Sequence, residues 1–573
     1  MLALNIQQSA CATVRLQRQC QPRQCQPRQY PPRQYPPRQY PPRRFLLGLV
    51  LNLLAVSLWA APAPPAESSA PDFLAAEPDI LQLQLAMGAG RITSRQLVEF
   101  YLSRIERLNA SGVALNVVRE VNPDAVDRAE ALDAERRAKG PRSPLHGLPI
   151  LIKDNFQTEG MSTTAGSKLF SGFQPSGDAY QVTRLRAAGA IILGKTNMHE
   201  FGFGITGQGS SFGRARNPYA LERNPGDGAA AAVAANLAVA ALGTDSCGGL
   251  RTAAAHNSLV TLRGTQGLSS RSGIVPLSHT QDMAGPLARS VSDLALLLDA
   301  TVGFDPADQQ SALSLQKIPS SYTRSLDLLA LQGARIGVLE DLLLVDPEDS
   351  QVVGVFGAAL AELQAAGAEL ERIKAPELVA LMDSRVNGFF VLAHDFRTDI
   401  AAYLQSQPLP GIVSLEDILA RGQHDASIDA SLRLAQAMDA NSEADYLAEL
   451  VHRRRFREVV MAIMARNELS ALAYPSMRRV AAPLGAPQPG NNCRLSANTG
   501  LPAVSVPAGF TADGFPVGLE LLGPSWSESS LLSLAFSYEQ ATRHRRGPVF
   551  DHPIFEHNQQ PDSPQPQENT QTP

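Results

Sequence analysis

The sequence predicts an α/β domain in which a sheet is covered by helices on both faces. Two observations lead to this fold class. Short apolar runs of strand length alternate with longer segments of helical periodicity from about residue 80 to residue 553. The strand candidates are apolar almost throughout, as expected for strands buried on both faces. No linker, repeat or strong shift in composition interrupts this stretch, so a single domain over residues 78–555 is predicted.

The elements of the first half follow from their local patterns. A capped helix is expected from Ser94 through Ile105, because an apolar rhythm of helical period follows that serine. A strand is expected over 148–153, then a helix over 182–188 and a strand over 190–193. Residues 229–241 (AAAAVAANLAVAA) have very high helix propensity and almost no polar face, so they predict a helix buried on all sides.

The second half continues the alternation. Strands are expected over 334–339 (ARIGVL), 501–510 (LPAVSVPAGF) and 516–523 (PVGLELLG). Helices are expected over 352–366 and 527–542.

Residues 1–44 differ in composition from the rest. The first 66 residues contain eight arginines and no acidic residue, and five tandem pentapeptides (QCQPR twice, QYPPR three times) fill residues 19–43. Proline in every copy excludes helix and interior strand, so an extended, solvated, cationic arm is predicted.

Residues 45–66 resemble an export signal. An apolar run of 17 residues, Phe45 to Ala61, follows Arg43 and Arg44 and precedes a small, proline-rich segment. The run is short for a membrane-spanning helix. Export to the periplasm or the outside is therefore expected, with a membrane anchor at 45–61 as the alternative. Residues 556–573 are polar and proline-rich and predict a disordered tail.

Charge and cysteine content narrow the possible functions. The net charge is only −5, and basic residues beyond the N-terminus are mixed with acidic ones, which argues against a nucleic-acid partner. Cys247 and Cys493 are the two cysteines of the predicted domain, and no C-x-x-C motif or histidine cluster occurs, so neither a metal nor a cofactor is expected. A single bridge between the two cysteines is possible, and so are two free thiols.

Four long motifs occur in a characteristic order. They are HGLPILIKDNFQTEGMSTTAGS, GAIILGKTNMHEFGFG, the block from residue 242 that begins LGTDSCGGLRTAAAHNSLVTLRGTQGLSS, and NTGLPAVSVPAGFTADGFPVGLELLG. This set resembles the amidase-signature family over nearly the whole predicted domain. The resemblance implies a large mixed sheet packed between helices. It also implies hydrolysis of carboxylic amides by a serine nucleophile, a bridging serine with a cis peptide bond, and a lysine that accepts the proton.

The family's catalytic positions are assigned to individual residues of this sequence by matching the motifs. Lys153, in LPILIKDN, matches the family's lysine. Gly249 occupies the position of the nucleophile, because Gly243 and Arg251 keep the family's spacing around it. The bridging-serine loop is shortened to Gly226-Asp227-Gly228 and retains no serine.

These departures predict a protein without the family's hydrolytic chemistry, because glycine offers no oxygen or sulfur for covalent catalysis. The backbone amides of Ser246, Cys247, Gly248 and Gly249 are expected to remain as a donor nest for a carbonyl or carboxylate. The predicted function is therefore a binding scaffold for a small amide, a carboxylate or a protein partner. The sequence carries no indication of oligomeric state.

Two charged residues are expected near this site in structural roles. Asp227, new in the shortened loop, is a candidate ion-pair partner of Lys153. Asp245 and Arg251 match family positions and are expected to pair beneath the loop.

Other interpretations stay open. An active amidase could use Cys247 or Ser246 as nucleophile, although a packing role is favoured for Cys247. An amidotransferase subunit would share the fold, but it should be cytosolic and keep its serines. A further alternative is the product of a decaying gene, which would have no selected function. Several nearby polar residues are assigned supporting roles: Ser210, Ser211, Arg214, Arg216, Asn498 and Thr499.

Overall fold

The computed structural model describes residues 70–207, 212–343, 349–382, 388–438 and 442–550. The predicted arm, the export signal, the tail, and Ser210 and Ser211 lie outside these residues. Within them, no helix is both long enough and apolar enough to cross a membrane.

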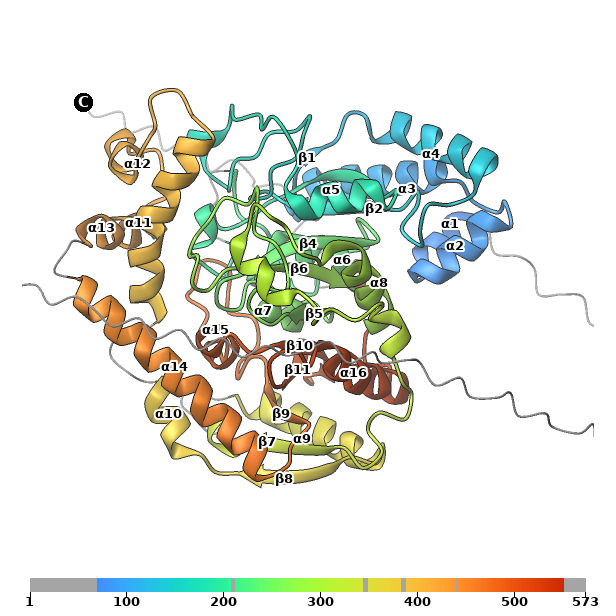
Figure 1. Ribbon diagram of the computed structural model, residues 1–573. Helices are drawn as coiled ribbons and strands as arrows, with labels where there is room; N and C mark the ends of the chain where they lie inside the picture. Colours follow the sequence, from blue (N-terminus) through green and yellow to red (C-terminus); the bar gives the residue numbers. More distant parts are fainter. Residues whose placement is uncertain (1–69, 208–211, 344–348, 383–387, 439–441, 551–573) are drawn as a thin grey trace, which may run out of the picture. The chain divides into compact units, whose positions relative to one another are not determined.

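Eleven strands form one mixed sheet in the order β1-β3-β2-β4-β6-β5-β10-β11-β9-β7-β8 (Figure 1). β2 runs parallel to β3 and β4, β7 runs parallel to β8 and β9, and the remaining neighbours are antiparallel. The predicted fold class is therefore confirmed. The strands are β1 Val118–Val121, β2 Pro149–Lys153, β3 Ile191–Thr196, β4 Ala240–Asp245, β5 Val260–Arg263, β6 Met283–Ala288, β7 Arg335–Leu339, β8 Glu369–Ile373, β9 Ala471–Pro475, β10 Ala503–Phe510 and β11 Pro516–Leu522.

Helices pack against this sheet. α8 contacts β5 and β6, α16 contacts β10 and β11, and α9 contacts β8 to β11, whereas α10, α11 and α15 contact α14 (Figure 1). The helices are α1 Ala70–Ala75, α2 Ile80–Gly88, α3 Ser94–Ile105, α4 Ala125–Lys139, α5 Tyr180–Ala187, α6 Gly228–Ala234, α7 Arg251–His256, α8 Val291–Thr301, α9 Ser350–Ala365, α10 Pro376–Met382, α11 Gly388–Ser406, α12 Leu415–Arg421, α13 Asp429–Ala437, α14 Glu443–Arg466, α15 Arg494–Thr499 and α16 Glu528–Thr542.

The capped helix expected from Ser94 through Ile105 is present as α3, and its capping residue is Thr93, whose side chain accepts from Gln96 N. Two other local predictions need correction. The helix expected over 229–241 ends at Ala234, and Ala240 already pairs with Ile150 in the sheet. Asn498 and Thr499 lie in helix α15, not in a strand and turn. The alanine-rich case shows that pairing with a buried strand outweighs local helix propensity.

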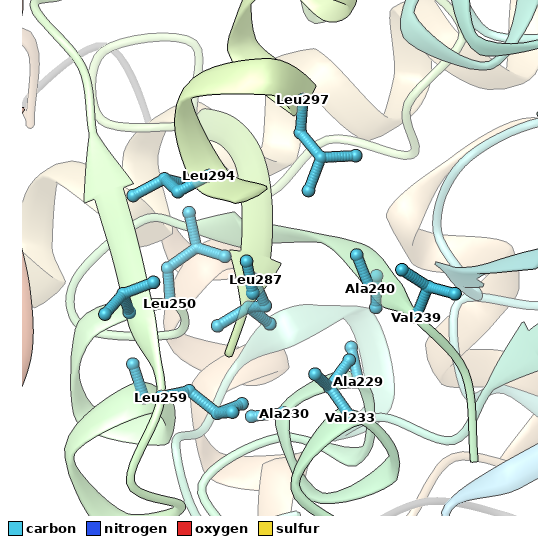
Figure 2. Packing of buried hydrophobic residues seen from close by; sticks show 14 of the residues in the cluster. Ala229, Ala230, Val233, Val239, Ala240, Leu250, Leu259, Leu287, Leu294 and Leu297 are labelled. Atoms are coloured by element: carbon cyan, nitrogen blue, oxygen red, sulfur yellow. The ribbon is translucent and has the colours of Figure 1, made fainter. Parts of the chain in front are cut away.

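The alanine-rich segment belongs to the main hydrophobic cluster of the core. Every residue of α6 is buried, as predicted for this stretch. Figure 2 shows Ala229, Ala230 and Val233 of α6 near Leu250 and Leu287, which come from the α7 side and from β6. Because alanine side chains are small, the helix can approach the sheet closely and fix the loops at its two ends.

Candidate active site

A cavity of about 450 Å³ opens where β2 and β4 end. Polar side chains of its lining come from both strand ends and from the loop that precedes β6, and apolar side chains line it as well. The polar residues include Lys153, Asn155, Thr244, Ser246, Gln281 and Asp282, and the apolar residues include Phe201, Phe203, Val275, Leu277, Leu342, Val379, Met382 and Leu392. A concave site with an apolar body and a few converging polar groups is typical of small-molecule sites.

Lys153 is the last residue of β2, and its side chain is only 5% exposed. Its Nζ lies 2.6 Å from Oδ2 of Asp227. The other oxygen of Asp227 accepts from the backbone N–H of Ala229, so the same carboxylate caps α6. The ion pair that the sequence analysis expected is therefore present.

The loop before α6 has room for one side chain only. Gly226 has φ +83°, and a Cβ there would lie 2.7 Å from the Cα of Ala253. A Cβ on Gly228 would lie 2.2 Å from the carbonyl oxygen of Asn197. These contacts restrict both positions to glycine, so Asp227 is the single functional side chain of the loop.

The loop after β4 is organised by the buried carboxylate of Asp245. Its oxygens accept from Gly248 N at 2.7 Å and from Arg251 Nε at 3.0 Å, and Arg263 Nη1 lies 3.2 Å away. Burial alone would raise the pKa of this carboxyl, but the charges of Arg251 and Arg263 outweigh it and lower the pKa below its usual value. The expected structural pair of Asp245 and Arg251 is present.

The expected donor nest is only partly available. The N–H of Gly248 is used by Asp245. The N–H groups of Cys247 and Gly249 have no partner within the described part of the chain. Two backbone donors thus remain next to Ser246 for a carbonyl oxygen.

Gly249 lines the cavity with its backbone alone. A Cβ built there would lie 2.4 Å from the carbonyl oxygen of Thr244. In this backbone conformation, a serine at residue 249 would require the loop to shift. The glycine is thus matched to the shape of its own loop.

Ser246 is the hydroxyl of this loop that lines the cavity. It donates a hydrogen bond to Oδ1 of Asp282, while Oδ2 of Asp282 accepts from the N–H groups of Leu277 and Ser278 at 2.8 and 2.9 Å. Desolvation raises the pKa of Asp282, and these hydrogen bonds oppose that rise. A hydroxyl is thereby directed at a carboxylate of increased basicity.

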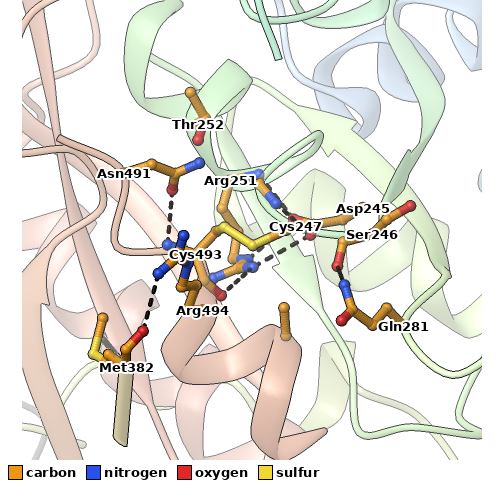
Figure 3. The surroundings of a disulfide bond; sticks show 12 residues. Asp245, Ser246, Cys247, Arg251, Thr252, Gln281, Met382, Asn491, Cys493 and Arg494 are labelled. Carbon is orange, nitrogen blue, oxygen red and sulfur yellow. Dashed lines mark hydrogen bonds and ion pairs between the residues drawn. A yellow bond between two sulfur atoms is a disulfide. The ribbon is translucent and has the colours of Figure 1, made fainter. Parts of the chain in front are cut away.

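Cys247 forms a disulfide with Cys493 (Figure 3). The bond joins the loop after β4 to the start of α15, and both cysteines line the cavity. The carbonyl of Cys493 also accepts from Arg251 Nη2 at 3.2 Å. The idea that Cys247 acts as a thiolate nucleophile is therefore wrong, because its sulfur is already bonded.

Some lining residues were missed by the sequence analysis. Asn155 donates from Nδ2 to Thr244 Oγ1 at 3.2 Å, and its Oδ1 has no partner among the described residues. Gln281 donates to the carbonyl of Ser246 at 3.3 Å, and Arg494 reaches the cavity from α15. Asn155 lies two residues after Lys153 and could have been found by that spacing. Gln281, Asp282 and Arg494 could not, because only the folded chain brings them to the site.

One group of side chains has the composition of a metal site. Ligand atoms of His279, Asp395 and Asp399 lie within 4.8 Å of one another. The carboxylate of Asp395 already accepts from Ser278 Oγ and from Tyr446 Oη at 2.7 Å, and Asp399 accepts from the His279 backbone at 2.6 Å. These bonds join α11 to the segment that carries Asp282 and account for the cluster as a structural link.

Comparisons with known proteins agree on one family. The family model described as Amidase matches residues 96–532. A probable amidase of Arabidopsis thaliana is 33% identical over 487 residues, which cover 83% of this chain and 92% of that protein. A subunit of the glutamyl-tRNA(Gln) amidotransferase of Acinetobacter baylyi is 33% identical over 480 residues, covering 81% and 96%. The crystal structure of native peptide amidase from Stenotrophomonas maltophilia is similar with a TM-score of 0.77 at 38% identity, covering 83% of this chain and 99% of that one.

Proposed function

Because this chain belongs to the amidase family, we propose that its cavity takes carboxamides and that cleavage of a carboxylic amide bond is its reaction. The similarity to peptide amidase extends over almost all of that enzyme, which supports this reaction class. The similarity to a glutamyl-tRNA(Gln) amidotransferase supports the same class of bond. The expectation of an inactive scaffold finds no support in these comparisons.

The observation that carries the proposal is the hydrogen bond from Ser246 to Asp282 in the cavity that also contains Lys153. In the proposed reaction, Ser246 Oγ attacks the carbonyl carbon while its proton passes to Asp282. The carbonyl oxygen of the substrate becomes negatively charged and accepts hydrogen bonds from the N–H groups of Cys247 and Gly249. The amide nitrogen takes up the proton and leaves as ammonia or an amine. Water then hydrolyses the acyl ester, releases the acid and restores Ser246.

A second candidate is binding of an amide without hydrolysis. It is favoured by Gly249, whose loop leaves no space for a serine side chain, and by the pairing of Lys153 with Asp227. The Lys153 amine is engaged by the Asp227 carboxylate, 2.6 Å away, in place of the serine hydroxyl that the family resemblance would put beside it.

Ammonia release from peptide amides and simple carboxamides separates the two candidates. Wild-type protein is compared with Ser246→Ala and Asp282→Asn, and with Ser111→Ala, a change at an exposed serine, as the control. If Ser246 is the nucleophile, its loss reduces turnover by roughly 10³-fold or more, whereas the control keeps its rate. Equal turnover in wild type and Ser246→Ala contradicts the Ser246 route. Amide binding without any ammonia release favours the second candidate.

Export remains a proposal for this protein. It is motivated by the apolar run at 45–61 and supported by the Cys247–Cys493 disulfide, since disulfides persist mainly in oxidising compartments. Cell fractionation of the full chain and of a chain with charged residues inserted into 45–61 tests it. Retention of the altered chain in the cytoplasm is expected, and identical distributions of the two chains contradict the proposal.

A further inference from the structure

The cavity lining contains more basic than acidic residues. Lys153, Arg478 and Arg494 are basic, whereas Asp282 is the one acidic residue among the described residues of the lining. Lys153 is already neutralised by Asp227, and the Asp282 carboxylate accepts hydrogen bonds from Ser246 and from two backbone N–H groups. Arg494 therefore supplies positive charge to this lining that neither Asp227 nor Asp282 offsets.

Among the described residues, the Arg494 side chain uses only part of its hydrogen-bonding capacity. It is the first residue of α15 and is partly buried. Its Nη1 donates to the carbonyl of Met382 at 2.9 Å, which fixes the guanidinium at the cavity wall. Within the described ranges, this bond to Met382 is the contact that its side chain makes, and no acidic residue pairs with it. A fixed guanidinium with spare N–H groups is well suited to a carboxylate, which it can bind with two parallel hydrogen bonds.

The disulfide sets the separation between this cation and Ser246. Ser246 precedes Cys247 and Arg494 follows Cys493, and Figure 3 shows them on opposite sides of the sulfur–sulfur bond. The two cysteine Cα atoms are 5.2 Å apart. Because consecutive Cα atoms are about 3.8 Å apart, the Cα atoms of Ser246 and Arg494 are at most about 13 Å apart. A small molecule can therefore contact both side chains.

The cavity lining that adjoins Arg494 is partly apolar. Met382, whose carbonyl accepts from Arg494, belongs to α10, and Val379 of the same helix and Leu342 also line the cavity. A short hydrocarbon segment can pack there while polar groups at its two ends reach Ser246 and the guanidinium.

We propose that Arg494 selects amides that carry a carboxylate, so that the ligand is a short carboxamide with an anionic group a few bonds from the amide. This inference rests on the proposed function, because it assumes that the carboxamide lies at Ser246. Arg494 acts here as a specificity-determining residue and takes no part in bond cleavage.

Calorimetric titration of the full-length protein with glutaramate and with its methyl ester tests this inference. The two ligands have the same carboxamide and differ in charge. Wild-type protein should bind glutaramate on the order of ten- to a hundredfold more tightly than the ester, because a charged hydrogen-bonded pair is lost in the ester. Added salt should weaken glutaramate binding more than ester binding.

Three variants assign the preference to one side chain. Arg494→Gln should reduce the affinity for glutaramate to that for the ester and leave the affinity for the ester nearly unchanged. Arg494→Lys should restore part of the preference for glutaramate. Arg454→Gln is the matched control, since that arginine is 82% exposed on α14 and outside the cavity lining.

The outcomes are distinguishable. Equal binding of glutaramate and ester to wild type overturns the role of Arg494 and leaves the carboxamide site intact. An equal loss of both ligands in Arg494→Gln, with no recovery in Arg494→Lys, also overturns it, because that pattern indicates a structural role. Binding of neither ligand to wild type overturns both this inference and the proposed function.

Discussion

Lys153 and Asp227 form a buried ion pair of 2.6 Å that joins the end of β2 to the start of α6. The side chains are each 5% exposed, so neither charge has much water around it. The resemblance of the sequence to the amidase-signature family places a bridging serine in this loop. The carboxylate of Asp227 instead holds the lysine and caps the helix at once.

Removing one partner of this pair should destabilise the fold strongly. Asp227→Ala is expected to lower the free energy of unfolding by about 3–5 kcal/mol, because it leaves a buried ammonium without a counter-charge and α6 without a cap. Urea denaturation measures the effect. Glu222→Ala is the control, since Glu222 is 58% exposed and its change should stay within about 0.5 kcal/mol.

The same pair predicts a rescue. Lys153→Met combined with Asp227→Ala should recover part of the lost stability, because the buried charge is then absent. A loss below about 1 kcal/mol in Asp227→Ala, or additive losses in the double variant, would show that the pair is not coupled.

A side chain at residue 249 should strain the loop after β4. Gly249→Ala places a Cβ 2.4 Å from the carbonyl of Thr244, so a loss of roughly 1–3 kcal/mol in unfolding free energy is expected. Gly172→Ala is the matched control, because that glycine has no atom within 4 Å of the added Cβ and an ordinary φ. If both variants are equally stable, the loop has more space than its conformation indicates. This result would also bear on any attempt to place a serine there.

Loss of the disulfide should loosen the cavity wall. Replacing Cys247 and Cys493 by serine is expected to cost about 2–5 kcal/mol and to weaken ligand binding, because the loop after β4 is then no longer tied to α15. The measurement is best made in a chain with Cys11, Cys20 and Cys25 replaced by serine, so that no other thiol is present. A melting temperature unaffected by reduction would contradict the expectation.

Glu200 should make stability depend on pH. It is fully buried, and desolvation raises its pKa to about 7, whereas the ordinary value is 4.5. A raised carboxyl pKa means that the folded state holds the proton more tightly than the unfolded chain does. Its stabilising effect is complete below about pH 4.5 and is lost as the pH rises to about 7, a change on the order of 3 kcal/mol.

Glu200→Gln removes this contribution and should flatten the profile in that window. Thermal unfolding between about pH 4 and pH 8 compares the variant with wild type. Parallel profiles would show that Glu200 does not titrate as its burial indicates. Glu539, whose pKa is also raised to about 7 by burial, provides a second variant for comparison.

Much of the fold could be predicted from local patterns. The buried runs at 148–153 and 516–523 become β2 and β11 nearly as expected, because continuous apolar strands have few alternatives to the middle of a sheet. The prediction for 229–241 is only half right. Its alanines favour a helix locally, but the pairing of Ala240 and Ala241 with β2 and β6 is a long-range contact that no local pattern contains.

The sequence by itself determined which residue types stand at the site: a lysine ending β2, one carboxylate in a short loop, and a glycine at residue 249. It also indicated the pairs Lys153–Asp227 and Asp245–Arg251. Only the tertiary structure decided that Cys247 is bonded to Cys493, that Ser246 faces Asp282, and that Arg494 reaches the same cavity. Ser246 and Asp282 are 36 positions apart along the chain, and Cys247 and Cys493 are 246 positions apart. Their meeting depends on how the sheet brings its loops together, which is a property of packing.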